Sequence, residues 1–307
     1  MRPKRDSSYG TAKALLLLGR VSNLPTVWSN CLTAWLLAGG DFTDEEPQLR
    51  FLCLIAGATL LYLAGMFLND AFDERFDREH RIERPIPSSA ISARTVWTLG
   101  GAQMALGLAC IIWIGVSAAL CALALVVVIL WYNRLHKQIA WSPLIMGLCR
   151  LLLYLLAGVA ASGTINTPLA IAALSLGGYV VGLSNIARKE VTRGRVNSWP
   201  CWLLALPLAV PFFLIKFSPE VIQLEATARG ILDWLPLLFV YALWVGRSLL
   251  FTFKAVIPQH DRTVSGLLAG MVLFDALMAS VPNPAFGLLF MALFFLSLLL
   301  QRFIPAT

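Results

Sequence analysis

The chain has 307 residues, of which 58% are hydrophobic and 13% charged, and its mean hydropathy is +0.75. This composition excludes a water-soluble globular enzyme and is typical of a protein that crosses a membrane several times. The formal net charge is +7. Because the basic residues follow the membrane orientation described below, no nucleic-acid partner is needed to explain this charge.

Ten apolar segments have the hydropathy of membrane spans. They cover residues 20–40, 51–70, 95–115, 117–132, 141–162, 168–187, 200–217, 231–252, 264–281 and 285–303. The last two are separated only by Val281-Pro282-Asn283-Pro284, so they could instead form one broken or re-entrant helix. No polar insertion is long enough for a soluble domain. The sequence therefore predicts an all-α transmembrane bundle of nine to ten spans in a single domain, residues 1–307.

Basic residues gather on one side of the predicted spans. The N-terminal arm, the connections after spans two, four, six and eight, and Arg302 hold every Lys and Arg except Arg50, Arg150, Lys216 and Arg229. By the positive-inside rule, both termini face the cytoplasm. The longest polar loops, 71–94 and 188–199, lie on the same side. We therefore expect the chemistry at the cytoplasmic face.

A group of carboxylates directly follows the apolar run 51–68. Asn69, Asp73 and Asp77 are spaced i, i+4 and i+8, so they share one face of a helix. Ionisable groups at the edge of a bilayer are costly and indicate a functional site. Together with Asp70 they offer oxygen ligands without a neighbouring Cys or His ligand. This set favours Mg²⁺ bound through carboxylates and a substrate phosphate.

The loop that follows is rich in arginine and proline. Arg84 precedes Pro85-Ile86-Pro87, and these prolines end any helix. Carboxylates that bind Mg²⁺, followed by guanidinium groups that can fork onto phosphate oxygens, form a receptor for a diphosphate group. The alternative is a solvated amphipathic loop with mixed charges.

These residues resemble the first motif of the UbiA-type membrane prenyltransferases, Asn-Asp-x-x-Asp-x-x-x-Asp followed by Arg-Pro-(Leu/Ile)-Pro. Asn69 to Asp77 and Arg84 to Pro87 match every position. The resemblance extends to Arg20 to Pro25 and to Tyr132 to Lys137. It implies a helical bundle around a central cavity that opens sideways to membrane lipid. It also implies that prenyl diphosphate is bound through Mg²⁺ and that the prenyl group passes to a lipophilic or aromatic acceptor.

The resemblance and the polar residues together give three sets of candidates. The predicted catalytic residues are Asp73, Asp77 and Glu190. The predicted metal ligands are Asn69, Asp70, Asp73, Asp77, Asn185 and Glu190. The predicted substrate contacts are Arg20, Arg84, Lys137, Arg150, Tyr154, Arg188 and Lys189.

A second polar stretch follows the sixth span, where the family usually carries another aspartate-rich motif. Here residues 184–195 contain one carboxylate, Glu190, among four cations. Either Asn185 and Glu190 keep a reduced metal site while the cations take up diphosphate charge, or the site binds without turnover. The third alternative is a plain positive-inside loop. If turnover is lost, the protein is a prenyl-lipid binder, carrier or transporter.

The run from Ser184 to Glu190 resembles the divergent EboC-type branch of this superfamily. That resemblance implies the inner membrane of a bacterial cell and favours no acceptor.

Two charged residues lie inside predicted spans, Arg150 in the fifth and Asp275 in the ninth. A charge at this depth needs a partner. Arg150 and Tyr154 are i, i+4 neighbours, so both could line the cavity, but an ion pair of Arg150 with another helix is an equal alternative. For Asp275 we favour a structural role or a protonated carboxyl group.

Overall fold

The computed structural model describes residues 10–192, 196–217, 229–255, 257–279 and 284–306, without the side chains of 189–192, 214–217, 229–233 and 284. Within these ranges the fold contains helices and no strand, as predicted. The first half of the chain forms α1 (Thr11–Leu18), η1 (Val21–Asn23), α2 (Leu24–Leu37), α3 (Glu45–Phe72), α4 (Glu74–His80), α5 (Ala93–Ile114) and α6 (Val116–Leu135). The second half forms α7 (Ser142–Ser162), α8 (Thr167–Thr192), α9 (Pro200–Phe217), α10 (Arg229–Phe253), α11 (His260–Ala279), η3 (Pro284–Phe286) and α12 (Gly287–Gln301).

Each of the ten predicted apolar segments coincides with a helix of the structure. Among the described residues, α3, α5, α6, α7, α8, α10 and α11 are long and apolar enough to cross a membrane. The apolar helices within α9 and α12 are shorter. An integral membrane protein is therefore confirmed, whereas the number of spans stays a prediction.

The chain is broken at the start of the first predicted apolar segment, 20–40, where α1, η1 and α2 follow one another. Arg20 separates α1 from η1 with a φ of 42°, in the left-handed region that residues with side chains seldom adopt. Pro25 then lies in the first turn of α2, where its missing N–H costs nothing. Every residue of α2 except Trp28 is buried, so this helix runs through the interior of the bundle.

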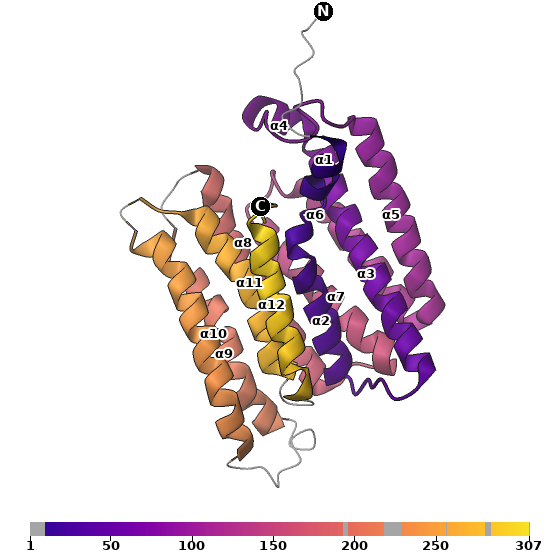
Figure 1. The fold of residues 1–307 in the computed structure, drawn as a ribbon, viewed down its shortest axis with the longest axis vertical. Coiled ribbons are helices and arrows are strands. Elements are labelled where there is room, and N and C mark those ends of the chain that lie inside the picture. The colour runs from indigo at the N-terminus through magenta and orange to yellow at the C-terminus, as the bar shows by residue number, and fades with distance from the viewer. Residues whose placement is uncertain (1–9, 193–195, 218–228, 256, 280–283, 307) are drawn as a thin grey trace, which may run out of the picture.

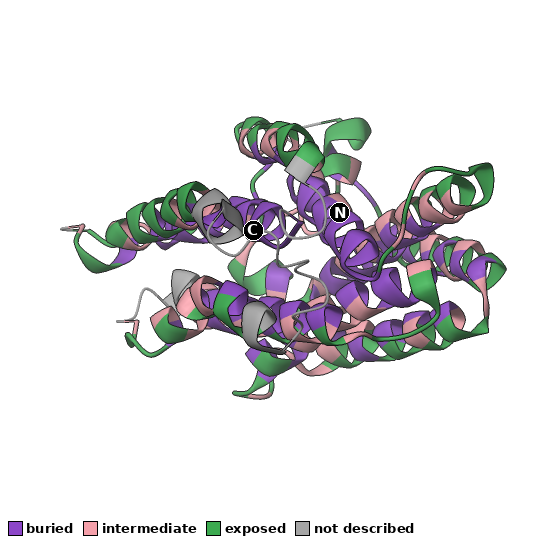
Figure 2. Ribbon diagram, turned by 90° about the horizontal axis from the view of Figure 1, so that it is seen from below, coloured by how far each residue is buried: buried purple, intermediate pink, exposed green. Residues whose placement is uncertain are grey.

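The other helices surround α2. It contacts α3, α7, α8, α11 and α12. Figure 1 shows α3 and α5 on one side of α2 and α9 and α10 on the other. Figure 2 shows that buried residues lie on the inward faces and exposed residues on the outer faces. Many of the outer residues are large and apolar, including Trp113, Trp202 and Leu288, which suits a surface in contact with lipid.

Glycine allows α7 and α8 to approach closely. A Cβ added at Gly147 would lie 2.6 Å from the carbonyl oxygen of Gly177 and 2.6 Å from Cγ2 of Val181. Small residues at such contacts let membrane helices pack backbone to backbone.

We expect Gly147→Ala to destabilise the protein by about 1–3 kcal/mol through this overpacking. Gly101→Ala in α5 is the matched control, because a Cβ there meets nothing within 4 Å. The control should be neutral or stabilising by up to about 1 kcal/mol, since alanine favours a helix. Thermal unfolding of both variants in detergent checks this prediction. Equal melting temperatures would contradict the close contact.

Candidate active site

The predicted carboxylates lie at the junction of α3 and α4. Asn69 and Asp70 belong to the last turn of α3, Asp73 joins the two helices, and Asp77 belongs to α4. The Asp73 N–H donates to the Asn69 carbonyl at 3.0 Å, and the Asp77 N–H donates to the Asp73 carbonyl at 2.9 Å. The helical spacing therefore continues across the junction. All four side chains are buried.

Arg84 folds back onto this junction and pairs with two of the acids. Its Nη1 lies 2.8 Å from Asp70 Oδ1 and 3.3 Å from Asp77 Oδ2. Arg20 approaches Asp70 Oδ1 from the start of η1 at 3.6 Å. Burial raises the pKa of Asp77, and the charge of Arg84 offsets only part of this effect. Burial also lowers the pKa of Arg84, although Asp70 opposes the shift.

Asp73 has different partners, at the end of α6. Lys137 Nζ lies 2.9 Å from Asp73 Oδ1, and His136 Nε2 lies 3.4 Å from Asp73 Oδ2. Burial alone would raise the pKa of Asp73, but the hydrogen bonds and charges of His136 and Lys137 outweigh burial and lower it. Lys137 also lies 3.7 Å from the centroid of the Phe76 ring.

The sequence reasoning missed two residues of this site, His136 and Asn133. Asn133 is buried; it accepts a hydrogen bond from Asn69 at 3.2 Å and donates one to the Gly65 carbonyl at 3.0 Å. Both residues lie in the segment from Tyr132 to Lys137, which resembles the family but from which only Lys137 was predicted as a site residue. The available signal was that His136 and Asn133 are polar residues at the end of an apolar span.

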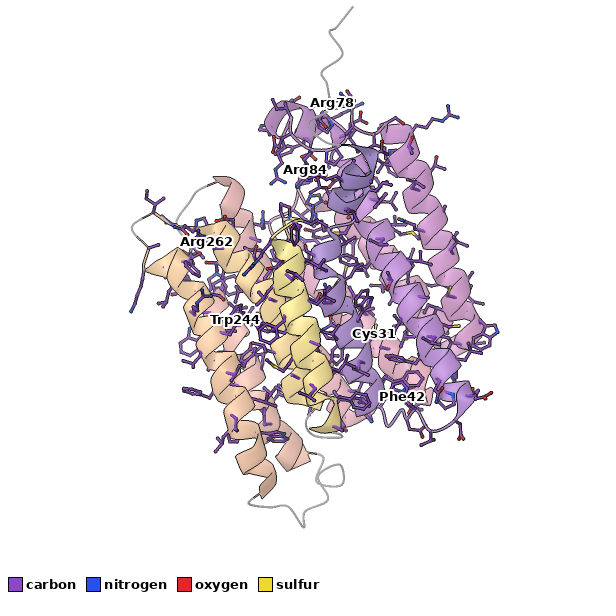
Figure 3. All side chains as sticks on the ribbon, in the orientation of Figure 1. Cys31, Phe42, Arg78, Arg84, Trp244 and Arg262 are labelled. Atoms are coloured by element: carbon purple, nitrogen blue, oxygen red, sulfur yellow. The ribbon has the colours of Figure 1, made fainter. Side chains whose placement is uncertain are left out.

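A cavity of about 450 Å³ connects these groups. Among the predicted site residues, its walls include Arg20, Asn69, Asp73, Arg84, Lys137, Arg150 and Arg188. Apolar side chains, including Met146, Val180 and Met271, line the rest. Figure 3 places Arg84 and Arg78 at the end of the bundle that carries α4. We call this space the head-group cavity.

A second, smaller cavity of about 100 Å³ lies between α3, α6 and α7. Its walls are mostly apolar, with Leu61, Leu125 and Ile129 among them. Five residues line both spaces: Tyr62, Met66, Tyr132, Met146 and Arg150. The smaller space is therefore an apolar neighbour of the head-group cavity, and we call it the inner cavity.

The second polar stretch contributes a cation to the head-group cavity. Arg188 lines the cavity and donates a hydrogen bond to the Ala140 carbonyl. Asn185 instead donates to the Val181 carbonyl on its own helix at 2.8 Å and is not part of the described lining. The side chains of Lys189 and Glu190 lie outside the described residues. Their predicted roles stay predictions.

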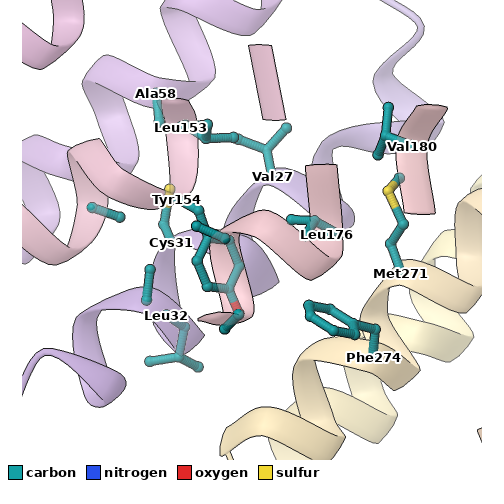
Figure 4. Close-up of a cluster of buried hydrophobic side chains, with 14 of the residues drawn as sticks. Val27, Cys31, Leu32, Ala58, Leu153, Tyr154, Leu176, Val180, Met271 and Phe274 are labelled. Carbon is teal, nitrogen blue, oxygen red and sulfur yellow. The ribbon is translucent and has the colours of Figure 1, made fainter. Parts of the chain in front are cut away.

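Arg150 and Tyr154 point to different surroundings. The Arg150 guanidinium lines both cavities and donates to Asn30 and Thr26 of α2, at 2.8 and 3.0 Å. Tyr154 is fully buried and donates to Asp275 Oδ1 at 3.2 Å, so the structure places it outside the described lining of both cavities. Figure 4 shows Tyr154 among buried side chains that include Cys31 and Leu176.

Asp275 links α11 to α2 and α7. Its Oδ2 accepts hydrogen bonds from Ser29 at 2.5 Å and from Asn30 at 2.6 Å, and its Oδ1 accepts the one from Tyr154. The side chain is completely buried. This arrangement agrees with the structural role that the sequence favoured.

The oxygen ligands at the α3–α4 junction fit Mg²⁺, which prefers carboxylate and carbonyl oxygens. Asn69 and Asp73 line the head-group cavity, and Asp77 Oδ1 is buried without a hydrogen-bond partner. No three His, Cys, Asp or Glu side chains of the described residues converge on one point. Arg84 pairs with Asp70 and Asp77, and Lys137 pairs with Asp73. A bound metal would take over part of this charge compensation.

Comparisons with known proteins point in the same direction. The model of the UbiA prenyltransferase family matches residues 23–304. No curated protein sequence matches the chain. The resemblance to the EboC-type branch stays a prediction.

Several solved structures share the fold. A UbiA homologue from Archaeoglobus fulgidus bound to DMAPP and Mg²⁺ has a TM-score of 0.63 and 16% identity, covering 91% of this chain and 99% of that one. An apo UbiA homologue from Aeropyrum pernix K1 has a TM-score of 0.57 and 18% identity, and the match covers 85% of this chain and 97% of the homologue. A digeranylgeranylglyceryl phosphate synthase has a TM-score of 0.59 and 20% identity, covering 88% and 97%.

Proposed function

Since the chain belongs to the UbiA prenyltransferase family, we propose that it transfers a prenyl group from a prenyl diphosphate to a lipophilic or aromatic acceptor in the membrane. The observation that carries this proposal is the head-group cavity. It has one polar end, where buried carboxylates meet paired cations, and it adjoins an apolar cavity between membrane helices. A diphosphate suits the polar end, and a prenyl chain suits the apolar space.

The cations at the polar end would stabilise the leaving group. When the allylic carbon–oxygen bond breaks, negative charge grows on the diphosphate, and positioned donors lower the barrier. Arg20, Arg84, Lys137 and Arg188 all line the cavity in which this charge would develop. Mg²⁺ held by Asn69, Asp73 and Asp77 would supply further charge neutralisation.

The other product of bond cleavage is an allylic carbocation, which must be kept from water. Apolar walls exclude water, and an aromatic face attracts a desolvated cation by up to about 2 kcal/mol. Tyr62 and Tyr132 line both the head-group and the inner cavity. We propose that these two rings flank the carbocation.

A binder without turnover is the second candidate function. Within the described residues, the second polar stretch places the cation Arg188 at the cavity and turns Asn185 toward its own helix. A site with fewer metal ligands can hold a diphosphate through cations without promoting cleavage. The protein would then bind, carry or transport a prenyl lipid.

An assay of binding and diphosphate release, with radiolabelled geranyl diphosphate and the purified protein in lipid nanodiscs, distinguishes these two functions. We expect tight binding that requires Mg²⁺ and becomes weak in EDTA, followed by release of inorganic diphosphate when a membrane lipid extract supplies acceptors. Binding without diphosphate release would support the carrier. Binding that is unchanged in EDTA would contradict the metal site.

We place the polar end of the cavity at the cytoplasmic face of a bacterial inner membrane, on the basis of the distribution of Lys and Arg. Cysteine labelling of Arg78→Cys, which lies in the exposed part of α4, tests this orientation with a reagent that does not cross the membrane. Labelling only after the cells are opened is the expected result.

A further inference from the structure

Arg150 differs from the cations that surround the diphosphate end of the cavity. Arg20, Arg84 and Lys137 each pair with a carboxylate within 4 Å. Arg150 forms no ion pair with any carboxylate of the described residues, although it lies eight residues into α7 and lines both cavities. Within the described part of the chain, this guanidinium is thus a cation inside a membrane helix without a direct counter-ion.

Asn30 bridges Arg150 and the buried acid Asp275. A guanidinium only donates hydrogen bonds, so the oxygen of the Asn30 amide faces Arg150 and its nitrogen faces Asp275. Asp275 is already satisfied by Ser29, Asn30 and Tyr154. The amide therefore separates the two opposite charges.

The guanidinium keeps donors for a ligand. Asn30 and Thr26 accept from two of its five N–H groups, and no other acceptor among the described residues bonds to it. Arginine does not lose its proton in proteins, so it cannot escape the cost of burial by becoming neutral. A charge at membrane depth is stabilised by a partner of opposite sign. A ligand in the cavity can provide that partner.

Arg150 lies on α7, whereas Asp70 lies in the last turn of α3 and its partner Arg84 lies in the loop after α4. The ring of Tyr62 lies 5.9 Å from the Arg150 guanidinium. On α3, Tyr62 precedes Asp70 by roughly two helical turns, or about 12 Å. We infer that a group bound at Arg150 is separate from the group bound at Asp70 and Arg84.

We propose that Arg150 binds an acidic group of the acceptor, a carboxylate or another oxyanion on an otherwise lipophilic molecule. This rests on the proposed function, because it assigns the second substrate of the same transfer. The planar guanidinium matches a carboxylate through paired hydrogen bonds. The rest of the acceptor would lie along Tyr62, Met66 and Met146, which line the space between the two ends.

A matched pair of ligands tests the proposal by isothermal titration calorimetry on the purified protein in nanodiscs. 4-Butylbenzoate and 4-butylbenzamide have the same shape and differ in charge. We expect the wild type to bind the benzoate at least about 10-fold more tightly, as a charge-assisted hydrogen bond implies. Arg150→Met should remove this preference, and amide binding that remains measurable shows that the variant is folded.

Arg247→Met is the matched control. Its guanidinium lies on the exposed side of α10, 5.4 Å from the Trp244 ring and 5.3 Å from the Phe251 ring, and is not part of the described lining of either cavity. This variant should keep the wild-type preference. Thr26→Val removes one of the two hydrogen bonds that hold Arg150 and should reduce the preference for the benzoate several-fold. This variant replaces Arg150→Met as the test if Arg150→Met does not fold.

Three results would overturn the proposal: a wild type that does not prefer the benzoate, a preference that survives Arg150→Met, or benzoate binding that magnesium diphosphate abolishes by competition. The last result would place the carboxylate at the diphosphate end. Because the titration needs no prenyl diphosphate, its outcome is independent of whether geranyl diphosphate binds. Failure of the proposed function and failure of the Arg150 site are thus distinguished.

Discussion

Asp73→Ala is expected to weaken Mg²⁺-dependent binding of prenyl diphosphate by more than about 100-fold. Replacing a residue that only hydrogen-bonds to a metal ligand already lowers metal affinity or activity by about 10–100-fold. Asp73 is the one carboxylate among the described residues that line the head-group cavity. Its loss would also leave Lys137 and His136 without their acidic partner. Binding of labelled geranyl diphosphate at several Mg²⁺ concentrations measures the effect.

The residual binding of the variant is informative. Because Lys137 loses its acidic partner, the weak binding expected for the wild type in EDTA should be kept or increased in Asp73→Ala. A misfolded protein would lose it. Glu46→Gln is the matched control, since this acid is 72% exposed and pairs only with Arg50 among the described residues. An unchanged Mg²⁺ requirement in Asp73→Ala would contradict the metal site.

Arg84→Gln is expected to lower the free energy of unfolding by about 3–5 kcal/mol, the usual cost of removing one partner from a buried ion pair. Arg84 is 15% exposed, and its partners Asp70 and Asp77 are 7% and 2% exposed. Asp77 then lacks its cation, and Asp70 keeps only the longer, 3.6 Å contact with Arg20. Mg²⁺ should replace the missing cation, so the metal should raise the melting temperature more in the variant than in the wild type.

Thermal unfolding in detergent, with Mg²⁺ and with EDTA, measures both effects of Arg84→Gln. Arg78→Gln provides the comparison, because Arg78 is 52% exposed and its 2.7 Å pair with Glu74 lies at the surface. Such pairs contribute about 0–1 kcal/mol. A similar loss in both variants, or a Mg²⁺ response no greater than that of the wild type, would refute the assigned role of Arg84.

The sequence could predict the part of the site that is local. Asn69, Asp70, Asp73 and Asp77 lie within about two helical turns, so helical periodicity alone groups them. Arg84 follows closely enough to fold back onto the same junction. The apolar segments likewise predicted the helices, because a bilayer requires long apolar helices whatever their neighbours are.

Contacts between distant helices could not be predicted in this way. His136 reaches Asp73 and Asn133 reaches Asn69 across more than sixty positions, and nothing in the spacing of residues along α6 indicates which helix it faces. Tyr154 shares a helical face with Arg150, but its hydroxyl group turns to Asp275 and not to the cavity. Which partner a polar side chain finds depends on how the helices pack.

By itself, the sequence determined an all-α membrane bundle, the family resemblance and a carboxylate cluster suited to Mg²⁺ and diphosphate, because each follows from composition or from residues that are close in the chain. Only the tertiary structure decided that α2 is buried at the centre and that the head-group and inner cavities share a wall. The tertiary structure also places Arg150 in that shared wall without a carboxylate partner among the described residues. These features arise where α2, α3, α6, α7 and α11 meet, and they depend on packing that no single segment encodes.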